Sequence, residues 1–169
     1  YPHNTGVLEN SPGFERFYEN GNDESTIATW MKSAGYKNSF MGKYMNLYPA
    51  GVKRTYIPPG WTDWHVFLYR ESPDFYFAYT MNENGKLVKY HKKDEDYSTD
   101  VMKERSIEFI DKYSERSSPF FVFISTYAPH GPSDPAPRHA ELYTDLIYPK
   151  SESYHEEDTS DKPDIIRNL

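Results

Sequence analysis

The sequence contains no cysteine, and this absence excludes several kinds of chemistry at once. Without a thiol there is no disulfide, no thiolate metal site and no cysteine nucleophile. Three common signatures are missing as well: a glycine-rich phosphate loop, a G-x-S-x-G nucleophile turn and a CxxC pair. Any reaction carried by these residues must therefore use other groups.

Excess positive charge and long apolar runs are also lacking. The chain has 19 lysines and arginines against 26 acidic residues, a net charge of -7. No basic cluster stands out beyond "HKK" at 91–93, so the basic surface of a nucleic-acid partner is absent. No apolar run approaches the ~20 residues that a membrane helix needs. The sequence predicts neither a nucleic-acid partner nor a membrane span.

Aromatic residues are what the chain has in abundance. They make up 17% of its 169 residues, including sixteen tyrosines, and such a content argues against disorder. The length fits one domain. Tyrosine suits a sugar-facing surface, but ordinary packing is the simpler use of most of these rings.

The pattern of apolar and turn residues predicts an α/β domain with a mixed sheet. We expect two helices. The first begins at Asp23 or Ser25 and ends near Gly35, and the second begins at Asp96, Ser98 or Thr99. Their expected apolar positions are Ile27, Trp30, Met31 and Ala34 in the first, and Val101, Met102, Ile107, Ile110 and Tyr113 in the second.

Strands are expected at 36–41, where the segment runs into "GKY" at 42–44, within 56–69, and at 75–81, 86–91 and 120–124. Asn84-Gly85 predicts a hairpin turn between the third and fourth of these. The run "FFVFI" at 120–124 is continuously apolar, which is typical of a central strand covered on both faces. After residue 132 the chain is rich in proline and acidic residues, and no second domain is indicated.

His130 is the first candidate for chemistry, because it follows strand 120–124 at the edge where α/β sheets bind their ligands. Pro129 and Pro132 flank it and restrict the backbone around it. A histidine held there could give or take a proton near neutral pH. The alternative is a histidine that is merely hydrogen-bonded within an ordered loop.

Lys43 is the second candidate, since it follows a short strand through Gly42 and should reach the same edge. Its ammonium offers a compact positive charge to an anion. Taken alone, a solvated lysine at a strand end is the simpler interpretation. Together, Lys43 and His130 make a cationic pair suited to an oxyanion such as sulfate or phosphate.

Other polar clusters are weaker signals. "HEED" at 155–158 could be a metal cluster, but it lies in an acidic, polar stretch typical of solvated chain. The carboxylates of "DEDYSTD" at 94–100 precede a helix, where they favour the positive end of its dipole. The remaining histidines show no ligand spacing with one another: His3, His65, His91 and His139.

The order of several segments resembles the sulfatases of the alkaline-phosphatase-like superfamily, with most similarity to the N-acetylglucosamine-6-sulfatase and heparan-type branch. The segments run from end to end of the chain in the family's order. They are "YPHNTGV" at 1–7, "TIATWMKSAGYKNSFMGKYMNLY" at 26–48, "YIPPGWTDW" at 56–64, "YSTDVMKERSIEFI" at 97–110, "PFFVFISTYAPHGP" at 119–132 and "SDKPDIIR" at 160–167.

This resemblance implies part of a large α/β sandwich with helices on both faces of a mixed sheet. It also implies sulfate-ester hydrolysis by a formylglycine nucleophile, with a divalent cation, usually calcium, holding the sulfate. Lys43 matches the family lysine that stabilises charge on the sulfate. His130 matches the histidine that can protonate the leaving alcohol. The implied substrate is a sulfated carbohydrate or an aryl sulfate ester.

The chain departs from the family pattern in two ways. Many sulfatases read G-K-W-H, but here Met45 and Asn46 follow "GKY", so the base for sulfate release is unassigned and Asn46 is a candidate substrate contact. The C/S-x-P-x-R nucleophile motif and the metal aspartates are also absent. We therefore expect residues 1–169 to be a partial catalytic domain, inactive alone, whose calcium ligands lie outside this chain.

Two other functions stay open from the sequence. One is a phosphodiesterase or phosphonate hydrolase of the same superfamily, and the other is a non-catalytic remnant that binds sulfated glycans. A partial domain should leave sheet edges uncovered, so we expect self-association. The family implies a periplasmic, secreted or lysosomal location more than a cytoplasmic one.

Overall fold

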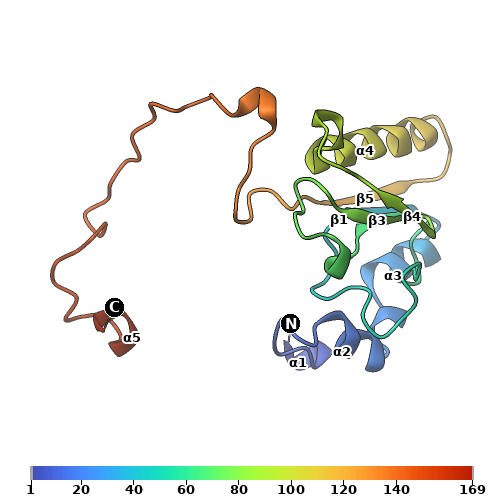
Figure 1. Cartoon of the computed structure of the whole chain (residues 1–169). Coiled ribbons are helices and arrows are strands. Elements are labelled where there is room, and N and C mark those ends of the chain that lie inside the picture. Colours follow the sequence, from blue (N-terminus) through green and yellow to red (C-terminus); the bar gives the residue numbers. More distant parts are fainter. Residues whose placement is uncertain (1, 169) are drawn as a thin grey trace. The chain divides into compact units, whose positions relative to one another are not determined.

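A five-stranded mixed sheet is the core of the first part of the chain in the computed structural model, which describes residues 2–168 (Figure 1). Two units are distinct, Tyr1–Pro137 and Arg138–Leu169. In chain order the elements are α1 (Pro2–Thr5), α2 (Phe14–Glu19), η1 (Asn22–Glu24), α3 (Ile27–Ser33), β1 (Lys37–Gly42), β2 (Asp63–Phe67), η2 (Tyr69–Glu71), β3 (Thr80–Glu83), β4 (Lys86–Lys89), η3 (Asp94–Asp96), α4 (Ser98–Ser114), β5 (Phe120–Ser125), η4 (Pro137–His139) and α5 (Asp164–Arg167).

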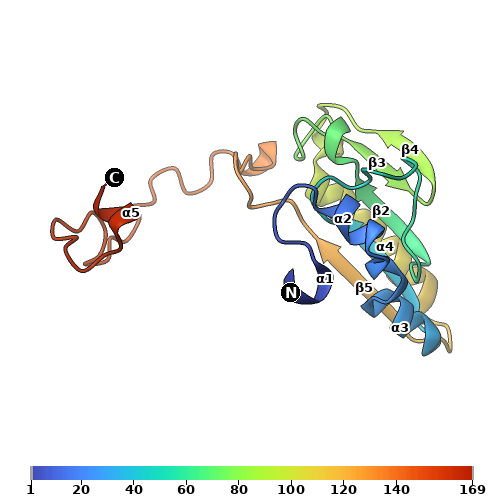
Figure 2. The same cartoon turned by 90° about the horizontal axis from the view of Figure 1, so that it is seen from below.

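The strand order is β4-β3-β2-β1-β5. Figure 2 shows β5 on the opposite side of the sheet from the β3–β4 hairpin. Strands β2, β1 and β5 are parallel, whereas β3 and β4 continue the sheet as an antiparallel hairpin. The predicted turn at Asn84-Gly85 is confirmed, with both residues at positive φ (50° and 86°), as such a hairpin turn requires. The carboxyl ends of β1 and β5 therefore lie side by side.

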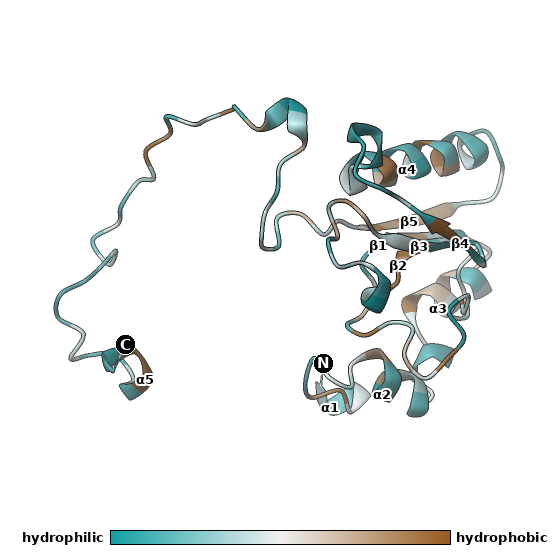
Figure 3. Ribbon diagram, viewed as in Figure 1, coloured by the Kyte–Doolittle hydropathy of each residue, from teal (hydrophilic) through white to brown (hydrophobic). Residues whose placement is uncertain are grey.

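Helices cover both faces of the sheet, which confirms the expected α/β class. Figure 1 shows α4 on one face and α3 on the other, and α4 contacts β1, β2 and β5. Under α4 lies one buried apolar cluster, and a second surrounds Trp64 and Phe14 on the opposite side. Figure 3 shows how the hydrophobic residues gather on the strands between these helices. Within residues 2–168, none of the helices combines the length and apolar character needed to cross a bilayer.

The prediction that β5 is a central strand covered on both faces is wrong for this chain. β5 is an edge strand, and Phe123 and Ile124 are 44% and 49% exposed. The reason is topological: β1 pairs with one side of β5, and no strand within residues 2–168 pairs with the other. The continuous apolar sequence of β5 shows that other elements could cover this strand. It does not show that such elements are present among residues 2–168.

Both main helices form where the sequence predicts them, and Val101, Met102 and Tyr113 of α4 are buried as expected, but other expected positions are not. Ile107 and Ile110 of α4 are exposed, and the buried positions one residue away are Ser106 and Phe109. In α3, Ile27 and Trp30 are exposed as well. That helix buries Ala28 instead, since the backbone of Gly60 passes close against it. It starts after Thr26, whose backbone N–H donates to the Thr29 hydroxyl (3.0 Å), rather than at Asp23 or Ser25.

The second unit, Arg138–Leu169, has little regular structure beyond the short helix α5. Its side chains are almost all exposed. Lys162 forms ion pairs with Glu156 (2.9 Å) and Asp161 (2.7 Å). Glu156 belongs to the "HEED" stretch, so at least one of its carboxylates is used by a lysine within the chain.

Candidate active site

Lys43 is placed by the end of strand β1. Its backbone N–H donates to the carbonyl of Ser125 (2.9 Å), so the last residues of β1 and β5 remain paired up to this point. Just before it, Gly42 has φ +104°, a conformation that side-chain-bearing residues rarely adopt. A Cβ atom at Gly42 would lie 2.0 Å from the Ser125 oxygen and 2.6 Å from the Met102 sulfur. Glycine at this position therefore allows the two strand ends to meet.

Replacing Gly42 by alanine should destabilise the fold by about 2–4 kcal/mol, because the overpacking and the positive φ both oppose the side chain. Urea denaturation measures this loss. Gly35→Ala is the matched control, since Gly35 also has positive φ (+88°), but a Cβ atom there would have no other atom within 4 Å. If Gly42→Ala and Gly35→Ala lowered the free energy of unfolding equally, crowding of the new side chain against β5 would contribute nothing to the loss.

His130 lies in a tight loop that follows β5. Its backbone N–H donates to the carbonyl of Tyr127 (2.9 Å), and its own carbonyl accepts from the Ser133 N–H (3.0 Å). The Tyr76 hydroxyl also donates to the His130 carbonyl, and the Ser133 hydroxyl donates to the carbonyl of Pro129 (2.9 Å). The loop is thus fastened by hydrogen bonds as well as by the restricted backbones of its prolines.

The imidazole of His130 is exposed, and one of its two nitrogens is already used. Nδ1 lies 2.9 Å from the carbonyl oxygen of Gly131. A carbonyl oxygen only accepts hydrogen bonds, so Nδ1 must be the donor and carry a proton. A second proton therefore binds at Nε2. In the protonated ring, Nε2–H is the donor left for a ligand.

The ring of Tyr127 brings the two candidates together. The Lys43 ammonium lies 5.7 Å from the centre of this ring, and the His130 imidazole centre lies 4.7 Å from it. Among residues 2–168, no carboxylate forms an ion pair with Lys43. The lysine and the histidine thus share one aromatic neighbour at the ends of β1 and β5, and no acidic side chain among the described residues pairs with the lysine.

Asn46, the third predicted residue, lines a pocket of about 360 Å³ beside Lys43. Its carbonyl accepts from the Phe14 N–H (2.9 Å), which ties the segment after β1 to α2. Glu9 and Asn10 line the same pocket from the loop between α1 and α2. No sequence pattern indicates these two residues, because they lie in a loop far from Lys43 along the chain.

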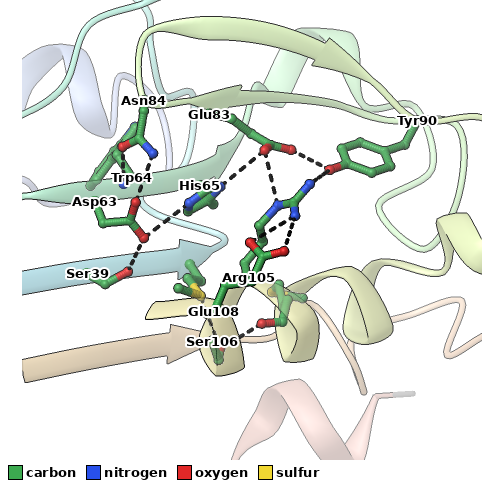
Figure 4. A network of polar contacts seen from close by, with 12 residues as sticks. Ser39, Asp63, Trp64, His65, Glu83, Asn84, Tyr90, Arg105, Ser106 and Glu108 are labelled. Carbon is green, nitrogen blue, oxygen red and sulfur yellow. Dashed lines mark hydrogen bonds and ion pairs between the residues drawn. The ribbon is translucent and has the colours of Figure 1, made fainter. Parts of the chain in front are cut away.

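A separate polar network surrounds the buried His65 (Figure 4). Its Nε2 lies 3.1 Å from Asp63 Oδ2, and its Nδ1 lies 3.3 Å from Glu83 Oε2. Burial lowers the pKa of this histidine, but the hydrogen bonds and charges of the two carboxylates outweigh it and raise the pKa to about 9. His65 is therefore a cation at neutral pH.

Further groups complete this network on both sides. Asp63 accepts from the Ser39 hydroxyl (3.0 Å) and the Asn84 amide (2.8 Å). Glu83 accepts from Arg105 of α4 (3.2 Å) and from Tyr90. Burial opposes the ionised forms of Asp63 and Glu83, but His65 first of all, together with these contacts, holds the pKa values of both carboxyls below their usual range.

The spacing of histidines along the chain does not indicate this network, because His65 pairs with two carboxylates and not with other histidines. Asp63 and His65 are two residues apart on one strand and so share a face, and Glu83 is the register partner of His65 on β3. Every charged member of the network has a partner of opposite charge. We therefore assign it to the stability of the sheet rather than to the reaction.

Residues 2–168 contain no group of three or more His, Asp or Glu side chains that could hold a metal ion. The described residues therefore do not fit a calcium site by themselves. Lys43 and His130, at the ends of β1 and β5, stay the candidate groups for chemistry on this chain.

Comparison with known protein families matches residues 1–161 to the sulfatase family. The chain belongs to the sulfatase family. This match covers nearly all of the chain, including both candidate residues at the sheet edge, and it agrees with the resemblance seen in the sequence.

Individual sulfatases are similar to this chain over almost all of its length. A putative extracellular sulfatase Sulf-1 homolog of Caenorhabditis elegans is 35% identical over 99% of this chain and 23% of that protein. N-acetylglucosamine-6-sulfatase of Bos taurus is 32% identical over 92% of this chain and 28% of that protein. The chain thus spans about a quarter of the length of these sulfatases.

A solved structure has the same fold over most of the chain. BT4656, solved in complex with its substrate D-glucosamine-2-N,6-O-disulfate, covers 89% of this chain with a TM-score of 0.64 and 22% sequence identity. This chain covers 27% of that structure. The five-stranded sheet described above is therefore a partial sulfatase fold.

Proposed function

We propose that this chain is part of the catalytic domain of a sulfatase that hydrolyses sulfate esters of sugars. The observation that carries the proposal is the shared position of Lys43 and His130 beside Tyr127, at the carboxyl ends of two parallel strands. The names of the similar proteins favour glucosamine 6-sulfate as the substrate unit. Since a Sulf-1 homolog is named extracellular, we also propose a secreted, periplasmic or lysosomal location.

In this proposal His130 is the proton donor to the leaving alcohol. When the sulfur–oxygen bond of the ester breaks, its electron pair stays on the sugar oxygen. A sugar alkoxide is a poor leaving group, so a proton delivered from His130 Nε2 during bond breaking lowers the barrier. The Nδ1–H bond to Gly131 fixes the ring so that Nε2 is the nitrogen presented to the ester.

Lys43 supplies positive charge where negative charge collects. The ammonium has no carboxylate partner among the described residues, so its charge is available to a sulfate oxygen. An electrostatic donor of this type is worth most when it is fixed before the substrate arrives. Asn46 is proposed as a weaker contact to the substrate in the adjoining pocket.

The remaining chemistry is proposed to come from residues outside this sequence. The sulfatase resemblance implies a formylglycine nucleophile and a divalent cation, usually calcium, that binds the sulfate. Because the described residues do not fit a metal site, the proposed roles of Lys43 and His130 involve no step through a cation. We therefore expect the 169-residue chain alone to be inactive.

The test is hydrolysis of glucosamine 6-sulfate by the whole protein that contains this chain. Lys43→Ala should lower kcat/KM about 10²-fold, as loss of one preorganised electrostatic donor does. Lys37→Ala, at the other end of β1, is the matched control and should retain activity. Bis(p-nitrophenyl) phosphate tests the phosphodiesterase alternative.

Three results would contradict the proposal. One is preferential hydrolysis of the phosphate diester, and another is equal activity of the Lys43 and Lys37 variants. The third is binding of sulfated sugar by the whole protein without turnover, which would favour the non-catalytic alternative. Turnover by the purified 169-residue chain would refute only the expectation that it is inactive alone.

A further inference from the structure

Tyr127 is the residue that both candidate catalytic groups contact. The Lys43 ammonium is 5.7 Å from its ring centre, within the ~6 Å range of cation–π attraction. The His130 imidazole lies against it in a tilted arrangement, with centres 4.7 Å apart and planes 31° apart. The position of Tyr127 therefore affects both groups at once.

Tyr127 is itself held in place by aromatic residues from a distant part of the chain. Phe75 stacks on it with ring centres 4.5 Å apart and an 18° interplanar angle. Tyr76 packs edge-on at 5.4 Å and also donates its hydroxyl to the His130 carbonyl. Residues 75 and 76 precede β3, so this contact joins the loop after β5 to the hairpin side of the sheet.

We propose that Tyr127 is a positioning residue for the reaction, whose ring face orients the Lys43 ammonium and the His130 imidazole toward one substrate. This inference rests on the proposed function for the roles of Lys43 and His130. We assign this positioning role to the aromatic ring of Tyr127 and not to its hydroxyl. The hydroxyl lies 3.4 Å from the Gly131 carbonyl, a long hydrogen bond.

The ionisation state of the Tyr127 phenol supports a role for its ring rather than for its hydroxyl. Burial, with Tyr69 and Asp74 nearby, raises the pKa of the Tyr127 phenol. The phenol is therefore neutral at the pH values where a histidine exchanges protons. A neutral phenol retains the negative ring face that attracts a cation, whereas it contributes no charge of its own.

The test compares Tyr127→Phe with Tyr127→Leu in the whole protein, using glucosamine 6-sulfate as substrate. The Phe variant retains the ring and should stay within about threefold of the natural kcat. The Leu variant should lose about 10- to 100-fold in kcat with little change in KM, because the reacting groups are present but misplaced. Tyr69→Leu is the matched control, since Tyr69 also packs on Phe75 but contacts neither candidate group.

A spectroscopic measurement tests the same inference without turnover. In the whole protein that contains this chain, the ring current of Tyr127 should shift the NMR resonances of the His130 ring protons. Tyr127→Leu should remove this shift, and Tyr127→Phe should preserve it. Absence of sulfatase activity in the unmodified whole protein would refute the proposed function but leave this measurement intact.

The inference is overturned by any of three results. Equal losses for the Phe and Leu variants would assign the effect to the hydroxyl. Equal losses for Tyr127→Leu and Tyr69→Leu would reduce it to general packing around Phe75. Unchanged His130 resonances in the Leu variant would show that the ring does not lie against the histidine in solution.

Discussion

Replacing His65 by glutamine is expected to lower the free energy of unfolding by about 3–5 kcal/mol, the usual cost of removing one partner from a buried ion pair. Glutamine keeps a polar group of similar length but carries no charge. Asp63 would then lose the cation at 3.1 Å, and its buried carboxylate would keep only the bonds from Ser39 and Asn84. Glu83 would still have Arg105.

Urea denaturation followed by tryptophan fluorescence measures this effect, since Trp64 is fully buried on the same strand. His91→Gln is the matched control, because His91 is exposed and lies outside the network. A His65 variant as stable as the His91 variant would mean that the network contributes no net stability.

The same network sets a pH dependence of stability with a defined sign. The pKa of His65 is about 9 in the folded chain, above its ordinary value of 6.5. The stabilisation is therefore complete below about pH 6.5 and is lost as the pH rises through about 9. A difference of this size corresponds to about 3 kcal/mol. Asp63 and Glu83, whose pKa values are lowered, add stability that is lost only when acid protonates them.

Replacing His130 by alanine is expected to lower kcat/KM of the whole protein about 10³-fold on glucosamine 6-sulfate, within the range for loss of a general acid. The loss should be much smaller on p-nitrophenyl sulfate. Nitrophenolate is a stable anion and leaves without a proton, so the missing donor matters less. The ratio of the two losses therefore measures proton donation, separately from any effect on folding or binding.

His139→Ala provides the control for this experiment, because His139 is an exposed histidine in η4. It should leave both substrates unaffected. Equal losses on the two substrates in the His130 variant would contradict its role as proton donor. Such a result would place His130 in substrate binding instead.

Local sequence predicted most elements of this fold better than it predicted their packing, although the strand expected at 75–81 begins only at Thr80. The Asn84-Gly85 hairpin follows from backbone preferences of two residues, and the structure contains it. Which face of α4 is buried depends on β1 and β5, so the expected burial of Ile107 and Ile110 was wrong by one position. The edge position of β5 depends on strand pairing, which apolar composition does not encode.

The same limit applies to the candidate site. Lys43 and His130 could be found because each follows a strand, and the ends of parallel strands meet. Tyr127 lies in the same motif as His130, but its role depends on Phe75 and Tyr76, which come from a distant segment before β3. Glu9 and Asn10 reach the pocket through a loop whose path no local pattern predicts.

The two carboxylates beside His65 also affect how this histidine responds when the medium changes from neutral to mildly acidic. Histidine is the side chain through which proteins most often detect a change from neutral to mildly acidic surroundings. His65 keeps its proton across that interval, and both of its carboxylate neighbours keep their charge. The sheet therefore carries the same internal charge whether the protein meets a neutral or a mildly acidic medium.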